Sequence, residues 1–356
     1  MVVAVIGVGL IGGSIGLAAR ERLGAMVRGF DPGDGVLEAA LERGAIDEAC
    51  ATAADAVAGA DTAFVAAPVG ALPAAVGEAL GAAGPECVVS DAGSTKRDVV
   101  AAHDDPRFVG GHPLAGAETA GVEHARADLF EGATWYLTPT DTTSGILYER
   151  LHRAIAEFGA GPVAIDASTH DRLLANVSHL PHVLANVLVS QAAHTLAGED
   201  ERLPASGPSF RDATRVAGAN GAIWTDIYLS NRDALVEQLD ETARRLATVR
   251  NALAAGDREE VAAWNERAAG DRRALLEAEL AGGPVHELRV SVPNEPGVVA
   301  QIALELGRAG INITDMALYP AADMREGVVA LWIAGDDAAA RAEERAAALG
   351  FPVARA

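Results

Sequence analysis

The sequence predicts an α/β protein in which a doubly wound parallel sheet is followed by an all-helical domain and a small C-terminal domain of strands and helices. Residues 1–166 alternate short apolar runs with helical stretches, which is typical of a parallel sheet covered by helices on both faces. Residues 167–281 show helical apolar spacing, and residues 285–356 follow the order strand, helix, strand, strand, helix, strand. We therefore expect three domains with these boundaries.

The net charge limits the partners of the chain. With 356 residues and a formal net charge of −22, the chain is long enough for two or three domains and is strongly acidic. Nucleic-acid binding depends on clustered lysine and arginine, and the sequence has no basic tract. We therefore exclude a nucleic-acid partner and expect an anionic substrate to need a local cluster of cations.

The cysteines and the first apolar segment bear on the compartment. Cys50 and Cys87 are the only cysteines, and their spacing suggests neither a disulfide framework nor a zinc site. The uncharged segment 2–19 is about as long as a membrane span, but it contains five glycines and no basic residue precedes it. We expect a cytoplasmic protein without a membrane span.

The strands of the first domain follow from its apolar runs. None of these runs alternates with polar residues, so both faces of the sheet should be covered. The predicted strands are Val2–Gly7, Val27–Asp31, Thr62–Ala67 and Cys87–Asp91. The segment 137–145 contains Pro139 and several threonines, which indicates a turn late in this domain.

The second domain should begin at a capping box formed by Ser168 and Asp171. Pro181 lies inside the predicted helical run, where it removes a backbone hydrogen bond and should kink the helix. His179 and His182 are one turn apart, as metal ligands can be, but no third ligand accompanies them and we expect no metal. Long amphipathic helices need a partner surface, so we expect a homodimer.

The C-terminal domain follows a plausible linker at residues 281–284. Its predicted elements alternate in a ferredoxin-like order, with the tail as the last strand. They are the strand His286–Val292, the helix Val298–Arg308, the strands Ile311–Leu318 and Gly327–Ile333, and the helix Asp337–Leu349.

A dinucleotide fingerprint opens the chain. Gly7, Gly9 and Gly12 form G-x-G-x-x-G directly after a predicted strand, and Asp31 ends the next strand. This arrangement predicts a Rossmann-type domain that binds the cofactor pyrophosphate at a helix N-terminus. Asp31 favours NAD over NADP because its carboxylate accepts ribose hydroxyls and repels an added phosphate. FAD is the weaker alternative. The expected cofactor contacts are Gly7, Gly9, Leu10, Ile11, Gly12, Asp31 and Pro68.

Four further clusters carry chemically useful side chains. The first two follow predicted strands of the sheet, at the edge where open α/β sheets bind ligands, and the last two lie in the helical domain. The clusters are Asp91–Lys96, Gly110–Glu118, Ser178–His182 and Phe210–Arg215, with Trp224 nine residues after the last.

These clusters, in this order, resemble the motifs of the prephenate and arogenate dehydrogenase family over nearly the whole chain. The resemblance implies that His112 contacts the ring hydroxyl of the substrate and that Ser94 assists it. It also implies that Arg215 binds the ring carboxylate, with His182 and Trp224 near the substrate. We add Arg211, where many relatives have lysine, together with Glu118 and Lys96, to the expected substrate site.

Lys96 is the only lysine among the 28 lysine and arginine residues. Our hypothesis is that it adds positive potential near the nicotinamide or the substrate, and the alternative is a surface lysine without a role. The chemistry itself asks for a histidine, because an imidazole with a pKa near 6.5 can accept the hydroxyl proton during hydride transfer. A guanidinium fork such as that of Arg215 suits a carboxylate.

The predicted reaction is the oxidative decarboxylation of prephenate with NAD, which yields 4-hydroxyphenylpyruvate, carbon dioxide and NADH. Arogenate dehydrogenation, with the same chemistry and tyrosine as product, remains open. A 3-hydroxyacid dehydrogenase is disfavoured. Members of that family resemble one another in having a catalytic lysine on the helical domain, and the predicted helical domain of this chain contains no lysine. A silent NAD- and amino-acid-binding sensor is disfavoured by the set His112, Ser94 and Arg215.

The last seventy or so residues resemble an ACT domain, a ferredoxin-like module that binds amino acids at dimer interfaces. The resemblance implies a ligand loop at residues 292–297 and a second-strand entry at residues 310–313. Tyrosine, the end product of the pathway, is the expected effector, and a purely structural module is the alternative. The expected effector contacts are Asn294, Pro296, Gly297, Asn312 and Ile313.

Overall fold

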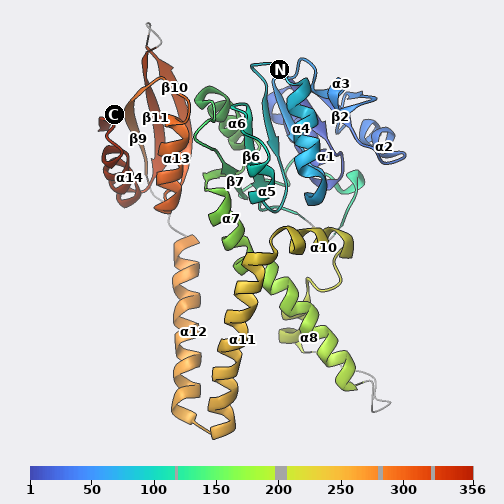
Figure 1. Cartoon of the computed structure of the whole chain (residues 1–356), viewed down its shortest axis with the longest axis vertical. Helices are drawn as coiled ribbons and strands as arrows, with labels where there is room; N and C mark the ends of the chain where they lie inside the picture. The colour runs from blue at the N-terminus through green and yellow to red at the C-terminus, as the bar shows by residue number, and fades with distance from the viewer. Residues whose placement is uncertain (117–118, 197–206, 280–283, 322–324, 356) are drawn as a thin grey trace. The chain divides into compact units, whose positions relative to one another are not determined.

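The computed structural model describes residues 1–116, 119–196, 207–279, 284–321 and 325–355, and Figure 1 follows the chain through its elements. The chain separates into two compact units. The first contains residues 1–171, 219–230 and 285–356, and the second contains residues 172–218 and 231–284. The division into three domains at the predicted boundaries stays a prediction, and one helix of the predicted helical domain belongs to the first unit.

Within the described residues, the first unit contains an eight-stranded sheet in the order β3-β2-β1-β4-β5-β6-β7-β8. The strands β1 to β6 pair in parallel, as predicted, and β7 runs antiparallel to β6 and parallel to β8. The strands are β1 (Val2–Ile6), β2 (Met26–Phe30), β3 (Glu48–Ala49), β4 (Thr62–Val65), β5 (Val88–Asp91), β6 (Phe108–Pro113), β7 (Thr134–Thr138) and β8 (Gly161–Ala164).

Helices cover both faces of this sheet. Side chains of β1 alternate between two apolar cores, with Val3 and Val5 in one and Ala4 and Ile6 in the other, because successive residues of a strand point to opposite faces. The segment 2–19 is therefore β1 and most of α1 in the core of a sheet domain. The covering helices are α1 (Leu10–Leu23), α2 (Val36–Arg43), α3 (Ala53–Val57), α4 (Leu72–Ala82), α5 (Arg97–Ala101) and α6 (Gly145–Glu157), with short turns η1 (Val69–Ala71) and η2 (Val122–His124).

The predicted capping box at the start of the helical run is wrong. The helix α7 (Ala167–Leu174) begins two residues earlier than a Ser168 cap would place it, and Asp166 caps it by accepting a hydrogen bond of 2.9 Å from the Thr169 N–H. Ser168 therefore lies inside the first turn. Asp171 is buried and accepts hydrogen bonds from other groups, among them the Lys96 and Arg97 N–H groups.

A π-helical segment lies just before Pro181, where the sequence predicts a kink; the kink itself stays a prediction. The residues Ala175–His179 (η3) form this segment between α7 and α8 (Leu180–Leu196). Pro181 cannot donate to the carbonyl one turn back, and a π turn is one way in which a helix absorbs such an interruption. Such segments occur often at functional sites.

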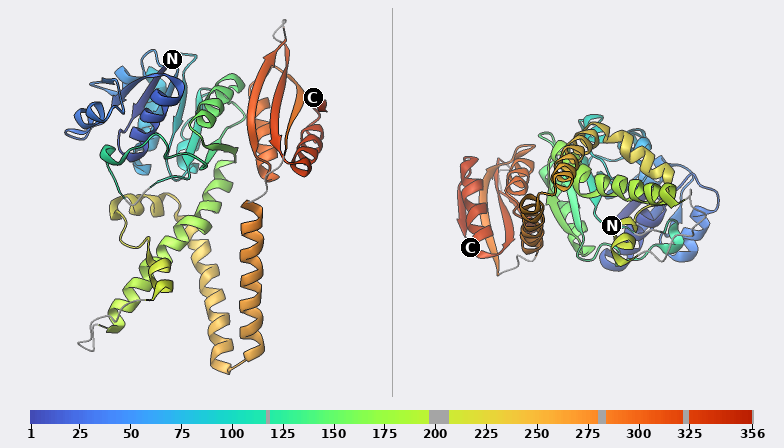
Figure 2. Two further views of the ribbon diagram at one scale, coloured as in Figure 1. Left: turned by 180° about the vertical axis from the view of Figure 1, so that it is seen from behind. Right: turned by 90° about the horizontal axis from the view of Figure 1, so that it is seen from below.

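The other long helices are α11 (Arg232–Ala255) and α12 (Arg258–Glu279), which lie side by side as a hairpin (Figure 2). The short helix α9 (Pro208–Thr214) packs against α8 within the same unit. By contrast, α10 (Gly221–Ser230) packs against η1 of the sheet domain, where the Ser230 and Thr95 hydroxyls are 2.8 Å apart.

Among the described residues, the run Ala167–His194 is the helix long and apolar enough to cross a membrane by length and composition. About a third of its most apolar window, 33%, is buried inside the protein. The run also carries the buried polar side chains of His170, Asp171 and His179. These polar residues favour a helix that packs in a protein core.

The C-terminal elements form, within the described residues, a four-stranded antiparallel sheet in the order β10-β11-β9-β12. The predicted order of elements is confirmed, with ends that differ by at most about two residues; of the predicted linker, residues 281–283 lie outside the described residues. The elements are β9 (Val285–Pro293), α13 (Val298–Arg308), β10 (Ile313–Pro320), β11 (Glu326–Ala334), α14 (Asp336–Ala348) and β12 (Val353–Arg355).

The C-terminal sheet and the eight-stranded sheet belong to the same unit, and parts of the chain near them approach each other closely through backbone atoms. Gly297 donates its N–H to the Thr143 carbonyl at 3.1 Å. A Cβ on Gly307 would lie 1.8 Å from the Ala164 carbonyl oxygen, so α13 passes directly over the end of β8. Side chains larger than hydrogen would separate the two sheets at these points.

Candidate active site

The fingerprint turn has the geometry that a bound pyrophosphate requires. Gly7 has a φ of 85°, and a Cβ on Gly12 would lie 1.9 Å from the Gly7 carbonyl oxygen, so both positions need glycine to form the turn. Among the described residues, nothing lies within 4 Å of a Cβ built on Gly9. Gly9 is therefore not needed for packing, and its smallness leaves room for a ligand beside the first turn of α1.

The carboxylate of Asp31 is held at the end of β2. Its Oδ2 accepts the Val8 N–H at 2.8 Å, and its Oδ1 accepts the Gly33 N–H at 2.8 Å. Each oxygen keeps lone-pair capacity for a ribose hydroxyl. Leu10 and Ile11 form the half-buried first turn of α1, and Pro68 is exposed directly after β4, the neighbour of β1. These positions fit the predicted NAD site.

The side chain of Asp91 connects the loop after β5, which carries Ser94, to the strand β6, which carries His112. Its Oδ1 accepts the Gly111 N–H at 3.1 Å, and its Oδ2 accepts the Gly93 N–H at 2.8 Å. A Cβ on Gly111 would lie 2.6 Å from the Asp91 carbonyl oxygen, so the strands can approach only with glycine there. The loop that carries Ser94 and the strand that carries His112 are thereby held together at one edge of the sheet.

Lys96 is not placed as the sequence suggested. Its side chain is fully buried, and its ammonium forms an ion pair with Asp91, which is also fully buried. Burial lowers the pKa of Lys96, and the Asp91 carboxylate opposes that shift. An ammonium enclosed in this way stabilises the loop and is not open to a substrate, so the expected substrate contact of Lys96 is corrected to a structural ion pair.

His112 lies near the end of β6 and is 8% exposed. Its Nδ1 is 2.9 Å from Nε2 of His170, and Nδ1 of His170 is 2.8 Å from Oδ1 of Asp171. Burial lowers the pKa of His170, partly opposed by its hydrogen bond to Asp171. His170 was not among the expected site residues, and Asp171 was expected only as part of a helix cap. A His-Asp pair at the start of the helical run was the available signal.

Comparison with known proteins places this geometry in a family. The family model described as "Prephenate dehydrogenase, nucleotide-binding domain" matches residues 15–163, and "Prephenate dehydrogenase, dimerization domain" matches residues 166–266. A prephenate dehydrogenase from Bacillus subtilis is 34% identical over 349 residues, which is 95% of this chain and 93% of that protein. The chain belongs to the prephenate dehydrogenase family.

Solved structures of family members have the same fold. A prephenate dehydrogenase from Aquifex aeolicus in complex with hydroxyphenyl propionate and NAD⁺ superposes with a TM-score of 0.72 at 27% identity, covering 77% of this chain and 98% of that one. A Synechocystis arogenate dehydrogenase gives a TM-score of 0.66 at 25% identity, covering 77% and 100%. The prediction of an NAD-dependent dehydrogenase is confirmed by this membership.

Trp224 lies on α10, in the same unit as His112. Its ring packs on that of Tyr228, with centroids 5.6 Å apart. The helix is fixed to the sheet domain through Thr95 and Ser230, close in sequence to Ser94. Glu118, by contrast, lies outside the described residues.

Arg211, Arg215 and His182 belong to the second unit of the enzyme. The two arginines are exposed and one helical turn apart, at the end of α9, so their guanidinium groups can serve one anionic ligand. His182 is buried on α8, and burial lowers its pKa. Its neighbour His179 pairs with the Asn231 amide at 3.2 Å. Whether these residues reach His112 stays a prediction.

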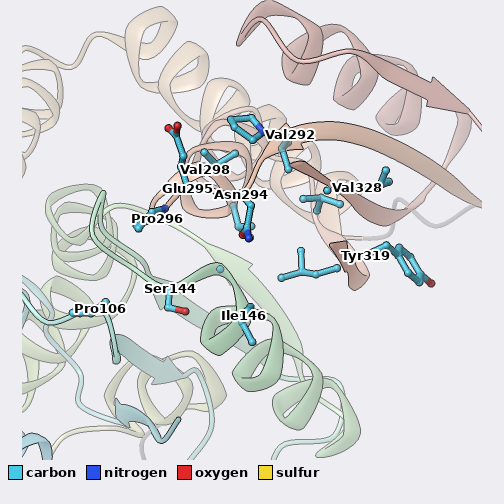
Figure 3. Close-up of a pocket in the computed structure, with 16 residues that line it drawn as sticks. Pro106, Ser144, Ile146, Val292, Asn294, Glu295, Pro296, Val298, Tyr319 and Val328 are labelled. Carbon is cyan, nitrogen blue, oxygen red and sulfur yellow. The ribbon is translucent and has the colours of Figure 1, made fainter. Parts of the chain in front are cut away.

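The expected effector residues are separated in the structure. Asn294 and Pro296 line a cavity of about 280 Å³ between the C-terminal sheet and α6, together with Ser144, Ile146 and Tyr319 (Figure 3). The Gly297 N–H is engaged by Thr143, and Ile313 is a buried residue of β10. Asn312 lies against Gly161 of the sheet domain. The first part of the predicted effector site therefore lines this cavity, and the second part does not.

Proposed function

We propose that this enzyme converts prephenate to 4-hydroxyphenylpyruvate and carbon dioxide by oxidative decarboxylation. The observation that carries the proposal is the position of His112, which lies near the end of β6, in the same sheet as the fingerprint strand β1, with Nδ1 engaged by His170. With Nδ1 engaged, Nε2 would be the ring nitrogen that accepts the hydroxyl proton of the substrate ring. Gly7, Gly9, the first turn of α1 and Asp31 would hold NAD, which supplies the hydride acceptor when bound.

The remaining roles follow from the chemistry of the substrate. Arg215 would hold the ring carboxylate through paired hydrogen bonds, with Arg211 adding positive charge beside it. Ser94, at the end of the Asp91 loop, would orient the ring hydroxyl toward His112. Loss of the carboxylate as carbon dioxide makes the ring aromatic, so these residues need only to orient the ring and accept one proton.

Arogenate remains the alternative substrate. It differs from prephenate only in the side chain, where an ammonium replaces a keto group. The Synechocystis arogenate dehydrogenase shares this fold, and a Zymomonas mobilis cyclohexadienyl dehydrogenase is 32% identical over 261 residues. Prephenate is favoured because the Bacillus subtilis relative, a prephenate dehydrogenase, matches 95% of this chain, including most of the C-terminal domain.

The deciding experiment is NADH production by the full chain with prephenate and with arogenate in parallel. Activity with prephenate alone supports the proposal, and activity with arogenate alone assigns the alternative. Silence with both substrates would contradict the proposed reaction and favour a sensor. His112→Asn is the control for the site: it should lower kcat by about 100-fold or more and leave NAD affinity within about twofold.

We further propose that the enzyme is a homodimer formed through its helical unit. Large apolar side chains are exposed on three helices of that unit, and a partner surface would cover them. They include Val187, Leu188 and Val189 on α8, Val236, Leu246 and Leu253 on α11, and Trp264 on α12. The family model for residues 166–266 is described as a dimerization domain. Light scattering of the purified chain tests this assembly.

We also propose that the C-terminal domain is an ACT domain that binds tyrosine as a feedback inhibitor. Its element order supports this assignment, as does its loop at Asn294 and Pro296 beside the cavity. The cavity has apolar walls, including Val292, Val299 and Val328, and the Ser144 and Asn294 side chains at its rim. Calorimetric binding of tyrosine by the full chain supports the proposal, and no binding with unchanged activity at millimolar tyrosine would contradict it.

We propose a cytoplasmic location because the cysteine thiols are not oxidised to a disulfide. Cys50 and Cys87 both lie in the described part of the chain, and both are free and buried. Burial raises the pKa of the Cys87 thiol to about 11, so this thiol is protonated and poorly reactive at neutral pH. Free cysteines are the expectation for a reducing compartment.

A further inference from the structure

Hydrogen bonds link His112 to His170 and His170 to Asp171, and they determine which ring nitrogens carry protons. Asp171 is 1% exposed, and its Oδ1 accepts the Lys96 N–H at 2.8 Å in addition to the His170 contact. Its Oδ2 accepts the Arg97 N–H at 3.0 Å and the Arg97 Nε–H at 3.2 Å. Burial by itself would raise the pKa of Asp171, but these hydrogen bonds hold it below its usual value. The carboxylate is therefore ionised and accepts at both oxygens.

An ionised acceptor decides the tautomer of His170. Because Asp171 can only accept, Nδ1 of His170 must carry the proton in the 2.8 Å contact. Burial lowers the pKa of His170, which favours the neutral ring, and in a neutral ring with its proton on Nδ1 the Nε2 atom has a lone pair and no proton. The ring is fully buried and packs edge-on against Tyr136, with centroids 5.6 Å apart. A flipped ring would place Nε2 away from His112.

The same reasoning extends to His112. Nε2 of His170 accepts, so Nδ1 of His112 must donate across the 2.9 Å contact. A neutral imidazole that carries its proton on Nδ1 has its lone pair on Nε2. We propose that His170 and Asp171 are positioning residues that hold His112 in the Nδ1–H tautomer, with Nε2 ready to accept a proton, and that stabilise its imidazolium form. This inference rests on the proposed function.

The alternative is a buried polar cluster that only stabilises the fold. Two features speak for the positioning role. The chain is directional, because the groups of Lys96 and Arg97 that contact Asp171 are N–H groups, which can only donate, so the carboxylate accepts from them as it does from His170. The charged groups near His170 are Asp171, Lys96 and Asp91, and the pair Lys96–Asp91 is internally neutralised. Asp171 is therefore the carboxylate in direct contact with His170, with its Oδ1 toward that ring and its Oδ2 paired with Arg97.

The test begins with the wild-type full chain and needs no activity. Long-range ¹⁵N–¹H spectra of the histidine rings, with the His112 signals assigned by comparison with His112→Asn, report which nitrogen carries the proton. At pH values at which the His112 ring is neutral, we expect the Nδ1–H tautomer. A dominant Nε2–H tautomer would overturn the inference, whatever the substrate of the enzyme proves to be.

The second arm compares variants of His170. His170→Phe keeps a ring but removes the acceptor, and it should lower kcat by about 100-fold with the KM for NAD within about threefold. His170→Gln offers an amide oxygen near the position of Nε2 and should recover most of that loss. His152→Phe is the matched control, a buried histidine outside the site, and should leave kcat within twofold.

The pH profile separates positioning from packing. In His170→Phe the acidic limb of kcat should move, because His112 loses the neighbour that stabilises its imidazolium, whereas a packing defect would lower kcat at every pH equally. Unchanged kcat, or equal loss in the Phe and Gln variants with an unmoved profile, would overturn the inference. If neither prephenate nor arogenate is a substrate, the proposed function fails while the tautomer measurement still decides this inference.

Discussion

The ammonium of Lys96 forms an ion pair with the Asp91 carboxylate, and both side chains are 0% exposed. Because Asp91 also accepts the backbone N–H groups of Gly93 and Gly111, this pair joins the loop after β5 to the strand that carries His112. Removing one partner leaves the other as an uncompensated buried charge.

Lys96→Met should therefore destabilise the protein by about 3–5 kcal/mol. Urea unfolding followed by circular dichroism measures this loss. The matched control is Arg126→Met, since Arg126 forms an exposed ion pair with Asp128 at 3.3 Å and should cost no more than about 1 kcal/mol. A loss below about 1 kcal/mol for Lys96→Met would show that the buried pair does not stabilise the site.

Two fingerprint glycines should respond differently to alanine. Gly9→Ala has space among the described residues, so the fold should persist while the affinity for NAD falls by about 10-fold or more, because the methyl group occupies the place of the pyrophosphate. Gly12→Ala would put a Cβ 1.9 Å from the Gly7 carbonyl oxygen and should lower the melting temperature as well. NAD titration and thermal unfolding measure both effects. Equal NAD affinity in Gly9→Ala and wild type is the result that would contradict the assigned cofactor site.

The contact between the sheet domain and the C-terminal domain depends on Gly297. Its φ is 84°, and a Cβ there would lie 2.2 Å from the Asp141 carbonyl oxygen. Gly297→Ala should cost about 2–4 kcal/mol or release the C-terminal domain, which would speed proteolysis between the domains. Gly310→Ala is the control: Gly310 has a φ of 67° and open space among the described residues, so about 1 kcal/mol is expected. Similar proteolysis of the two variants would argue against a fixed contact.

His152 on α6 should make stability depend on pH. Burial lowers its pKa to about 4, with Asp315 opposing the shift, and its unfolded pKa is roughly 6.5. The unfolded chain thus binds more protons between these values, so this contribution to stability is lost as the pH falls from about 6.5 to about 4. Between about pH 7.5 and about pH 5 the loss should be about 2 kcal/mol. Urea unfolding of His152→Phe at both pH values should show a smaller pH dependence, and an identical dependence would refute the assignment.

Arg215 is predicted to bind the ring carboxylate. Arg215→Ala should raise the substrate KM by about 10- to 100-fold, the range expected for a lost charge-assisted pair of hydrogen bonds, with the KM for NAD unchanged. Arg232→Ala is the control, because Arg232 is an arginine of the same unit with a side chain 74% exposed. Steady-state kinetics with the accepted substrate measure both variants. An unchanged substrate KM would mean that another residue holds the carboxylate.

Patterns that are local in the sequence predicted the structure well. The first helix of the C-terminal domain, α13, is predicted at Val298–Arg308 and forms there. Its apolar spacing and the preceding glycine are signals that act within a few residues. The strands at Val2 and Val88 were recognised from their continuous apolar runs, since a strand buried on both faces has no polar alternation. Errors arose where two local signals competed, as at Asp166 and Ser168, both of which are good helix caps.

The sequence by itself determined the sheet domain, the fingerprint turn, the helical run and the C-terminal order of elements, because periodicity and glycine positions act over short distances. Only the tertiary structure decided the environment of the chemical groups. His170 lies 58 residues from His112, and Asp91 lies 20 residues from Gly111, so no spacing rule connects them. Burial determined the environment of the other groups. It enclosed Lys96 together with Asp91, and it placed the Asp171 carboxylate against His170, where we propose that it orients the histidine pair.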